Sequence, residues 1–195
     1  MAIKVEETFE VQAPVERVWE YLIDPAKVAL CLPGAELLES RDDQTYLGAV
    51  KVKVGPITMS YRGVVKFTEL DEQARVVRLV GEAREAGGGG SAKLSMLSKV
   101  NPLPGGGSQV VVEADVDLVG KIVQFGRGMI DEVSRQLFRQ FSACVKQRLE
   151  GEESAPGEEP RATDTKAVSA TALGFRAIWA IIARFFERLF GKQPG

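Results

Sequence analysis

The chain has 195 residues, of which 45% are hydrophobic and 27% are charged, and its formal net charge is -2. This length suits one domain with an appendage, and this composition excludes a chain that is disordered throughout and a polytopic membrane protein. The sequence contains no histidine, which excludes Ser-His-Asp triads and histidine-ligated zinc. We expect no catalytic residue and no metal site, and therefore a protein that is not an enzyme. Because no basic stripe with interleaved aromatic residues is present, nucleic acid is not an expected partner.

The two cysteines, Cys31 and Cys144, lie far apart in the sequence, in apolar surroundings and without CxxC spacing. We expect both to be reduced residues of the core. The N-terminal segment lacks the apolar run of a secretory signal, which predicts a cytoplasmic domain.

The domain is expected to begin with a strand and two short helices. Residues 3–12 alternate apolar and polar side chains, with an irregular step near Glu7, as in a half-buried strand. Ala13-Pro14 ends this strand and starts an amphipathic helix, since proline favours the first helical position. Asp24-Pro25 caps a second helix, which Pro33-Gly34 ends.

From Ala35 to Leu118 the chain is rich in Val, Thr, Tyr and Phe, which favour strands. We expect five such runs, paired as an antiparallel meander and separated by turn-forming segments. The breaks are Asp42-Asp43-Gln44, Gly55-Pro56, Asp71-Glu72-Gln73, Gly87 to Gly90 and Gly105 to Gly107.

A long helix is expected from about Lys121 to Leu149. Its apolar residues recur on one helical face and are Ile122, Phe125, Met129, Ile130, Val133, Leu137, Phe141, Cys144, Val145 and Leu149. Together these elements predict an α+β fold in which a curved antiparallel sheet grips the long helix. Because a curved sheet cannot pack flush along a whole helix, we expect an apolar cavity between them.

The domain at 1–150 is followed by two further segments. Residues 151–170 are acidic, rich in proline and poor in apolar side chains, which predicts a disordered linker. Residues 171–192 predict an amphipathic helix, whose apolar face consists of Phe175, Ile178, Trp179, Ile182, Phe185, Phe186 and Leu189.

This last helix is too short and too charged to span roughly 30 Å of hydrocarbon. Its polar face is basic, with Arg176, Arg184, Arg188 and Lys192 against Glu187, and therefore suits an anionic membrane surface. Packing on its own domain or in a groove of a protein partner is the alternative. We favour docking on a membrane or a membrane protein, because a long disordered linker is a poor connection between a helix and its own core.

Several spaced motifs carry a family resemblance. They are Ala13-Pro14, Val18-Trp19, the stretch from Asp24 to Ala35, Tyr46-Leu47-Gly48, the stretch from Val50 to Pro56, and Tyr61-Arg62-Gly63. In this order they resemble the CoxG-like family of carbon monoxide dehydrogenase subunits, within the START/SRPBCC superfamily, over about Met1 to Glu150. The resemblance implies a helix-grip fold: a curved seven-stranded sheet around a long C-terminal helix, with a deep apolar pocket.

The resemblance also implies a function. Members of this family are associated with molybdenum-containing carbon monoxide dehydrogenases, and resemble membrane-recruiting subunits that bind a respiratory quinone. We therefore expect a carrier of menaquinone, ubiquinone or a similar isoprenoid lipid. Its partners would be that dehydrogenase or a related oxidoreductase and the inner face of the cell membrane, to which it would attach peripherally. Apolar residues alone do not distinguish the two quinones.

Alternation along the strands and the helix predicts which side chains line the cavity. They are Trp19, Leu22, Leu32, Val52, Val54, Met59, Tyr61, Leu94, Met96, Phe125, Met129, Val133 and Leu137. Methionine suits a flexible prenyl chain, although the same residues would make an ordinary core. Gly126 and Gly128 would let a flat ring approach the helix backbone, or are simply a helix start of weak propensity.

Two other functions remain open. The chain could recruit or assemble the dehydrogenase at the membrane without transporting a ligand, in which case its cavity would be empty or collapsed. It could also be an enzyme of the cyclase or hydrolase kind found elsewhere in the superfamily. That would require polar groups converging in the pocket, and without histidine only Tyr61, Arg62 or a buried carboxylate could serve.

Overall fold

Seven antiparallel strands form one sheet in the computed structural model, which describes residues 1–151. Their order across the sheet is β1-β7-β6-β5-β4-β3-β2, so all neighbours except β1 and β7 are consecutive in the chain. The strands are β1 (Ala2–Val11), β2 (Ala35–Ser40), β3 (Thr45–Val54), β4 (Ile57–Asp71), β5 (Val76–Glu85), β6 (Gly90–Pro102) and β7 (Ser108–Gly120). The α+β helix-grip fold predicted from the sequence is confirmed.

The predicted number of strands after Ala35 was one too low. The five turn-forming breaks all lie at or beside strand ends, but five breaks separate six strands, β2 to β7. The shortest of them, β2, lies at the edge of the sheet and pairs only with β3.

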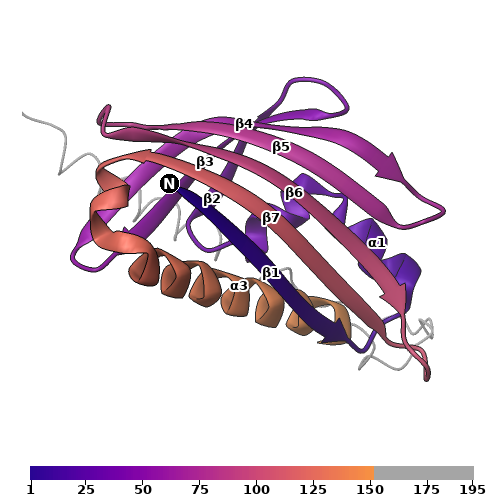
Figure 1. Ribbon diagram of the computed structural model, residues 1–195. Coiled ribbons are helices and arrows are strands. Elements are labelled where there is room, and N and C mark those ends of the chain that lie inside the picture. Colours follow the sequence, from indigo (N-terminus) through magenta and orange to yellow (C-terminus); the bar gives the residue numbers. More distant parts are fainter. Residues whose placement is uncertain (152–195) are drawn as a thin grey trace, which may run out of the picture. The chain divides into compact units, whose positions relative to one another are not determined.

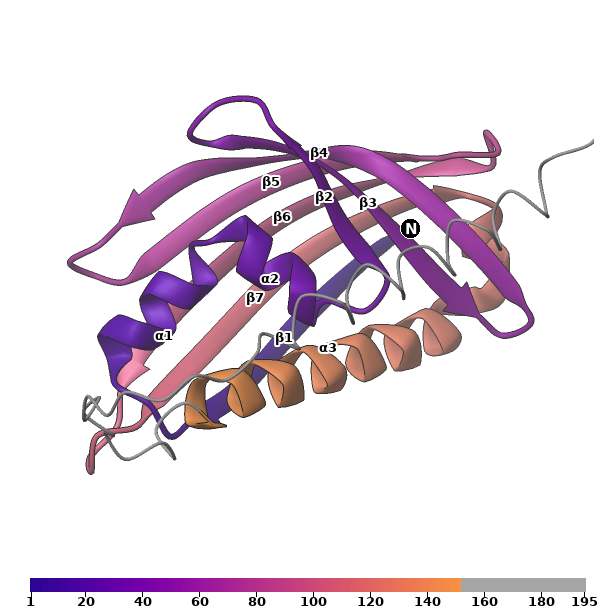
Figure 2. The same ribbon diagram turned by 180° about the vertical axis from the view of Figure 1, so that it is seen from behind.

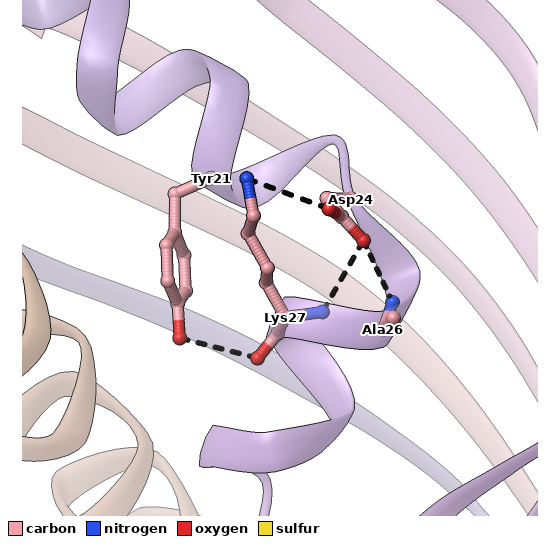
Figure 3. A network of polar contacts seen from close by, with 4 residues as sticks. All are labelled: Tyr21, Asp24, Ala26 and Lys27. Atoms are coloured by element: carbon pink, nitrogen blue, oxygen red, sulfur yellow. Dashed lines mark hydrogen bonds and ion pairs between the residues drawn. The ribbon is translucent and has the colours of Figure 1, made fainter.

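Two short helices, α1 (Val15–Leu22) and α2 (Pro25–Cys31), connect β1 to β2. The Asp24 carboxylate accepts hydrogen bonds from the backbone N–H groups of Ala26 and Lys27, at 3.0 and 3.3 Å, and so caps α2 as its sequence predicts. The Tyr21 hydroxyl donates to the Lys27 carbonyl oxygen at 3.2 Å (Figure 3). These contacts fix the corner between the two helices.

The long helix begins later than its apolar pattern predicts. A 3₁₀ turn, η1 (Lys121–Phe125), comes first, and α3 then runs through Gly126–Gly151. Gly126 separates them with a φ of 75°, a conformation that glycine adopts without steric cost. Gly126 and Gly128 are both exposed, and an added Cβ at either would meet nothing within 4 Å. Gly126 therefore allows the chain to turn into α3, whereas neither φ nor a close neighbour requires glycine at position 128.

The helix α3 lies along the concave face of the sheet, and α1 and α2 lie on the same side (Figures 1 and 2). The helix α3 runs parallel to β1, since its two ends contact the two ends of that strand. Arg127 donates a hydrogen bond to the Ala2 carbonyl, and the Glu150 carboxylate accepts one from the Gln12 N–H. Between these ends, the Phe9 ring meets Phe138 edge to face at 5.7 Å. This concave side is the interior of the domain.

The two cysteines do not match the expectation of reduced core thiols. Cys31, at the end of α2, forms a disulfide with Cys144 of α3, and their Cα atoms are 5.4 Å apart. The apolar surroundings were correctly predicted, since Cys31 is buried in the core. The pairing could not be inferred because 113 residues separate the two positions in sequence, and only the folded sheet brings α2 and α3 together.

Candidate functional site: the apolar interior face

Alternation along each strand decides which side chains point toward α3. In β4 the interior positions include Met59, Tyr61, Gly63 and Val65, and strand pairing places Tyr61 between Val50 of β3 and Glu85 of β5. In β6 they include Ala92, Leu94 and Met96, because their partners Leu118, Val116 and Ala114 share that face of β7. The concave face is therefore almost entirely apolar.

The buried side chains of this interior form two separate clusters, one toward each end of α3. The first combines α1 and the C-terminal half of α3 with one end of the sheet; it includes Phe9, Trp19, Cys31, Phe67, Val145 and Leu149. The second surrounds the start of α3 and consists of Ile3, Val54, Met59, Tyr61, Leu118, Ile122 and Ile130. A domain of this size usually has one contiguous core, so two separate clusters in one interior are unusual.

Four apolar side chains between the ends belong to neither cluster, and we call them the middle patch: Val65, Leu94, Met96 and Leu137. All four are only half-buried, although the strand residues occupy central strands of the sheet. Their exposed surface shows that the helices cover the middle of the concave face less completely than its ends.

Small residues, which we call the small row, occupy adjacent interior positions of four strands beside the middle patch. Gly48, Gly63, Ala83 and Ala92 follow one another across β3, β4, β5 and β6, and all four are half-buried. At Gly63 a Cβ would lie 2.2 Å from the Glu82 carbonyl oxygen, so close approach of β5 itself requires glycine there. The row leaves the backbone of the sheet uncovered by bulky side chains.

The interior has an uncovered edge at the end of β3, and exposed apolar side chains surround it. Strand β2 begins opposite Val50, and the Lys51 N–H still donates to the Gly34 carbonyl at 2.9 Å, so residues 52–54 of β3 have no strand on their outer side over about 10 Å. Three side chains, which we call the rim, flank this free edge: Leu32 after α2, Ile57 after the β3–β4 turn, and Met129 of α3. Their exposed fractions are 37%, 48% and 44%, and Met129 reaches the turn at Gly55.

Few polar groups face the interior. Tyr61 is 6% exposed, and burial, reinforced by the charge of Glu85, raises the pKa of its phenol. Glu85 accepts a hydrogen bond from the Gly89 N–H at 2.8 Å, and backbone hydrogen bonds from Gly89 and Gly87 lower its pKa. The phenol is therefore neutral at physiological pH, whereas the carboxylate is charged and held at the β5–β6 turn.

Two surface hollows lie outside this interior. One, of about 480 Å³, is on the outer face of the sheet, where Lys66, Glu82, Lys93, Asp115 and Asp117 contribute to its lining. The other, of about 680 Å³, lies between α1 and the end of α3; Arg17, Glu20, Lys27 and Arg148 are among its residues. The charged lining of the second hollow suits water or polar partners, whereas the first also contains Val64 and Val80 and lies on the face of the sheet that α3 does not cover.

The thirteen side chains predicted to line a cavity fall into four groups. Trp19 and Leu22 belong to the first cluster or pack against it. The second cluster and the side chains packed on it include Val52, Val54, Met59, Tyr61, Phe125 and Val133. Leu94, Met96 and Leu137 form most of the middle patch, and Leu32 and Met129 lie on the rim.

Sequence reasoning missed some residues of this region. Val65 has the same alternation phase as Met59 and Tyr61, which is a signal that could have identified it. Ile57 shares this phase too, but the alternation does not indicate that it remains exposed at the edge of the sheet. The small row was also missed, because glycine and alanine contribute little to a hydrophobic pattern.

The predicted linker at 151–170, apart from the helical Gly151, and the predicted amphipathic helix at 171–192 lie outside the described residues, as do the seven docking residues from Phe175 to Leu189. Within residues 1–151, no helix is long and apolar enough to cross a membrane. In the same range, no cluster of three or more Cys, Asp and Glu side chains could hold a metal ion.

Comparison with solved structures supports the fold. A conserved protein from Geobacillus kaustophilus superposes with a TM-score of 0.70 at 18% identity, covering 77% of this chain and 97% of its own. The ZhuI aromatase/cyclase from Streptomyces sp. R1128 gives 0.58 at 20% identity, with 80% and 98% covered. A START superfamily protein from Mycobacterium smegmatis gives 0.56 at 14% identity, with 76% and 98% covered.

Sequence comparison identifies the family. No protein with a curated description matches the chain. The CoxG family of carbon monoxide dehydrogenase subunits matches residues 8–150, which span β1 from Thr8 through the penultimate residue of α3 and so include nearly all of the interior face. Because this match covers more than half of the sequence, the chain belongs to the CoxG family of carbon monoxide dehydrogenase subunits.

Proposed function

We propose that this chain binds a respiratory quinone, or a similar isoprenoid lipid, on its interior face and carries it between the membrane and a molybdenum-containing carbon monoxide dehydrogenase-type oxidoreductase. The observation that carries the proposal is the middle patch, whose apolar side chains remain half-exposed at the centre of the sheet. Family membership supplies the dehydrogenase as partner.

The energetics of this surface favour an apolar cargo. Covering apolar surface contributes about 25 cal/mol per Å², so a prenyl chain laid between α3 and the sheet would be held without any charged contact. Met96, in the middle patch, would adapt to the irregular outline of such a chain because the thioether side chain is flexible and polarisable. Binding, and not catalysis, is therefore the chemistry that we propose.

The rim supports entry at the free edge of β3. Leu32, Ile57 and Met129 expose apolar surface there, next to interior residues of β3 such as Val52. A lipid leaving a bilayer at this edge would pass from one apolar surface to another. The proposed membrane tether is the amphipathic face that contains Trp179 and Phe186.

The primary test is native mass spectrometry with lipid extraction, on the full chain purified from a host that makes quinones. A bound quinone would establish the carrier and identify its cargo. A chain that is empty as purified, and still empty after incubation with menaquinone and ubiquinone, would contradict transport. That result would favour the alternative function, recruitment of the dehydrogenase to the membrane.

A variant pair tests the position of the ligand. Val133 is half-buried on α3 and packs toward the second cluster, so Val133→Trp should fill space beside the middle patch and weaken quinone binding about tenfold. Gln140→Trp adds the same side chain at an exposed position of α3 and should bind normally. Equal quinone occupancy in the two variants would contradict this location.

A second pair tests the tether. Trp179→Glu combined with Phe186→Glu places two charges on the apolar face and should move the chain from the membrane to the soluble fraction of lysed cells. Ser154→Glu combined with Thr165→Glu adds equal charge between the domain and that face, and should leave fractionation unchanged. Membrane recovery of the first variant at the wild-type level would exclude this tether.

A further inference from the structure

Tyr61 has the least complete hydrogen bonding of the three tyrosines. The Tyr46 hydroxyl donates to the Asp43 carbonyl at 2.8 Å, and Tyr21 donates to the Lys27 carbonyl at 3.2 Å. The contact described for the Tyr61 hydroxyl is to the Met59 sulfur at 3.9 Å, a weak acceptor at long range. A buried hydroxyl normally has an oxygen or nitrogen partner, so a ligand oxygen would complete this group.

The surroundings of Tyr61 would accommodate a flat ring. Gly63 is the next interior residue of β4 after Tyr61 and belongs to the small row. Gly48 of β3 and Ala83 of β5 lie on either side of it. No bulky side chain rises from these positions, so a planar group could lie against the backbone of the sheet. The middle patch begins one row further, at Val65 and Leu94, and would receive an apolar chain attached to that ring.

The charge state of Tyr61 fits a donor role. Burial and the nearby Glu85 both oppose ionisation of the phenol. The Glu85 carboxylate is itself engaged by the Gly89 N–H. The phenol therefore retains its proton, and a carbonyl oxygen is the complementary group because it can only accept hydrogen bonds.

We infer that the Tyr61 hydroxyl is a specificity-determining group, which donates a hydrogen bond to a carbonyl oxygen on the head group of the carried ligand. This inference rests on the proposed function, since it assigns the polar contact within the same interior site. The apolar surface supplies affinity for the chain of the ligand, whereas Tyr61 selects ligands that bear a carbonyl oxygen beside that chain.

The test compares two probes and two variants of the full chain. The probes are a short-chain menaquinone, which has carbonyl oxygens, and squalene, an isoprenoid hydrocarbon without oxygen. Tyr61→Phe removes only the hydroxyl, and Tyr46→Phe is the matched control because its hydroxyl already has a backbone acceptor. Tyr61→Phe should weaken menaquinone binding about tenfold and leave squalene binding unchanged, whereas Tyr46→Phe should alter neither.

Infrared spectroscopy of bound menaquinone supplies a readout that a purely structural role would not change. Hydrogen bonding lowers the carbonyl stretching frequency, so the lowered band should be present in the wild type and in Tyr46→Phe and absent in Tyr61→Phe. Equal menaquinone affinities and identical bands in all three proteins would overturn the inference while the carrier function stands. If the wild type binds neither probe, the proposed function fails, and the inference fails with it.

Discussion

At the scale of single residues, the clearest constraint is the close approach of two turns at Gly120. Its φ is 100°, and an added Cβ would lie 2.0 Å from the Gly89 carbonyl oxygen. Gly120→Ala should therefore destabilise the domain by backbone strain and by a clash with the β5–β6 turn. We expect a loss in the free energy of unfolding of at least about 3 kcal/mol, measured by urea denaturation.

Gly105 provides the matched control. It has the same φ of 100°, but an added Cβ would meet nothing within 4 Å. Gly105→Ala should then lose only about 1–2 kcal/mol, the cost of the left-handed backbone. Equal losses in the two variants would mean that the clash at Gly120 relaxes, and that strain alone requires glycine there.

A second residue-scale prediction concerns pH. Backbone hydrogen bonds lower the pKa of Glu85 in the folded state, so its contribution to stability is present above the unfolded pKa and is lost as pH falls through the folded pKa. Glu85→Gln should therefore be less stable than the wild type at about pH 6, with the difference shrinking toward about pH 3. Urea denaturation across this range measures it. A constant difference would contradict the ionic origin of the effect.

At the scale of elements, the disulfide joins α2 to the long helix across the open side of the sheet. It links residues separated by 113 positions, and a cross-link of such a long loop restricts the unfolded chain strongly. Cys31→Ser combined with Cys144→Ser should lower the free energy of unfolding by about 3–5 kcal/mol, measured with urea under non-reducing conditions.

Reduction provides the control for this variant. Dithiothreitol should destabilise the wild type toward the level of the double variant and leave the variant itself unchanged. If the wild type is equally stable with and without reductant, the two sulfurs contribute as packed thiols, which was the expectation from sequence.

The elements were largely predictable from sequence because their signals are local. Asp24-Pro25 predicted the cap of α2, and Gly55-Pro56 predicted the β3–β4 turn, since cap and turn geometry depend on a few adjacent residues. The disulfide and the close contact of Gly120 with Gly89 were not predictable. Both depend on which segments the folded sheet brings together, and alternation specifies a face without specifying the neighbour.

At the scale of the whole molecule, the interior face was predictable but its coverage was not. The alternation of Leu94 and Met96 correctly indicated the side that faces α3. It could not indicate that Val54 would be buried at an end of the interior while Leu94 remained half-exposed at its centre. That difference depends on where α1, α2 and α3 rest on a curved sheet, which also leaves the edge of β3 uncovered.

This uncovered edge leads to a prediction about transfer. If ligand enters at the rim, Ile57→Glu combined with Met129→Glu should slow quinone uptake from vesicles by about tenfold, because two charges would replace the apolar contact with the bilayer. Stopped-flow fluorescence with neutral phosphatidylcholine vesicles measures the rate and avoids repulsion by anionic lipid. Binding of a short-chain quinone from solution should keep its wild-type affinity, since the interior face is unaltered.

The control places the same charges on the outer face, with Val80→Glu combined with Val119→Glu. These side chains are 41% and 60% exposed and point away from α3, so uptake should proceed at the wild-type rate. Equal slowing in both variants would indicate a general effect of charge on membrane encounter. Normal uptake by the rim variant would exclude the edge of β3 as the entry.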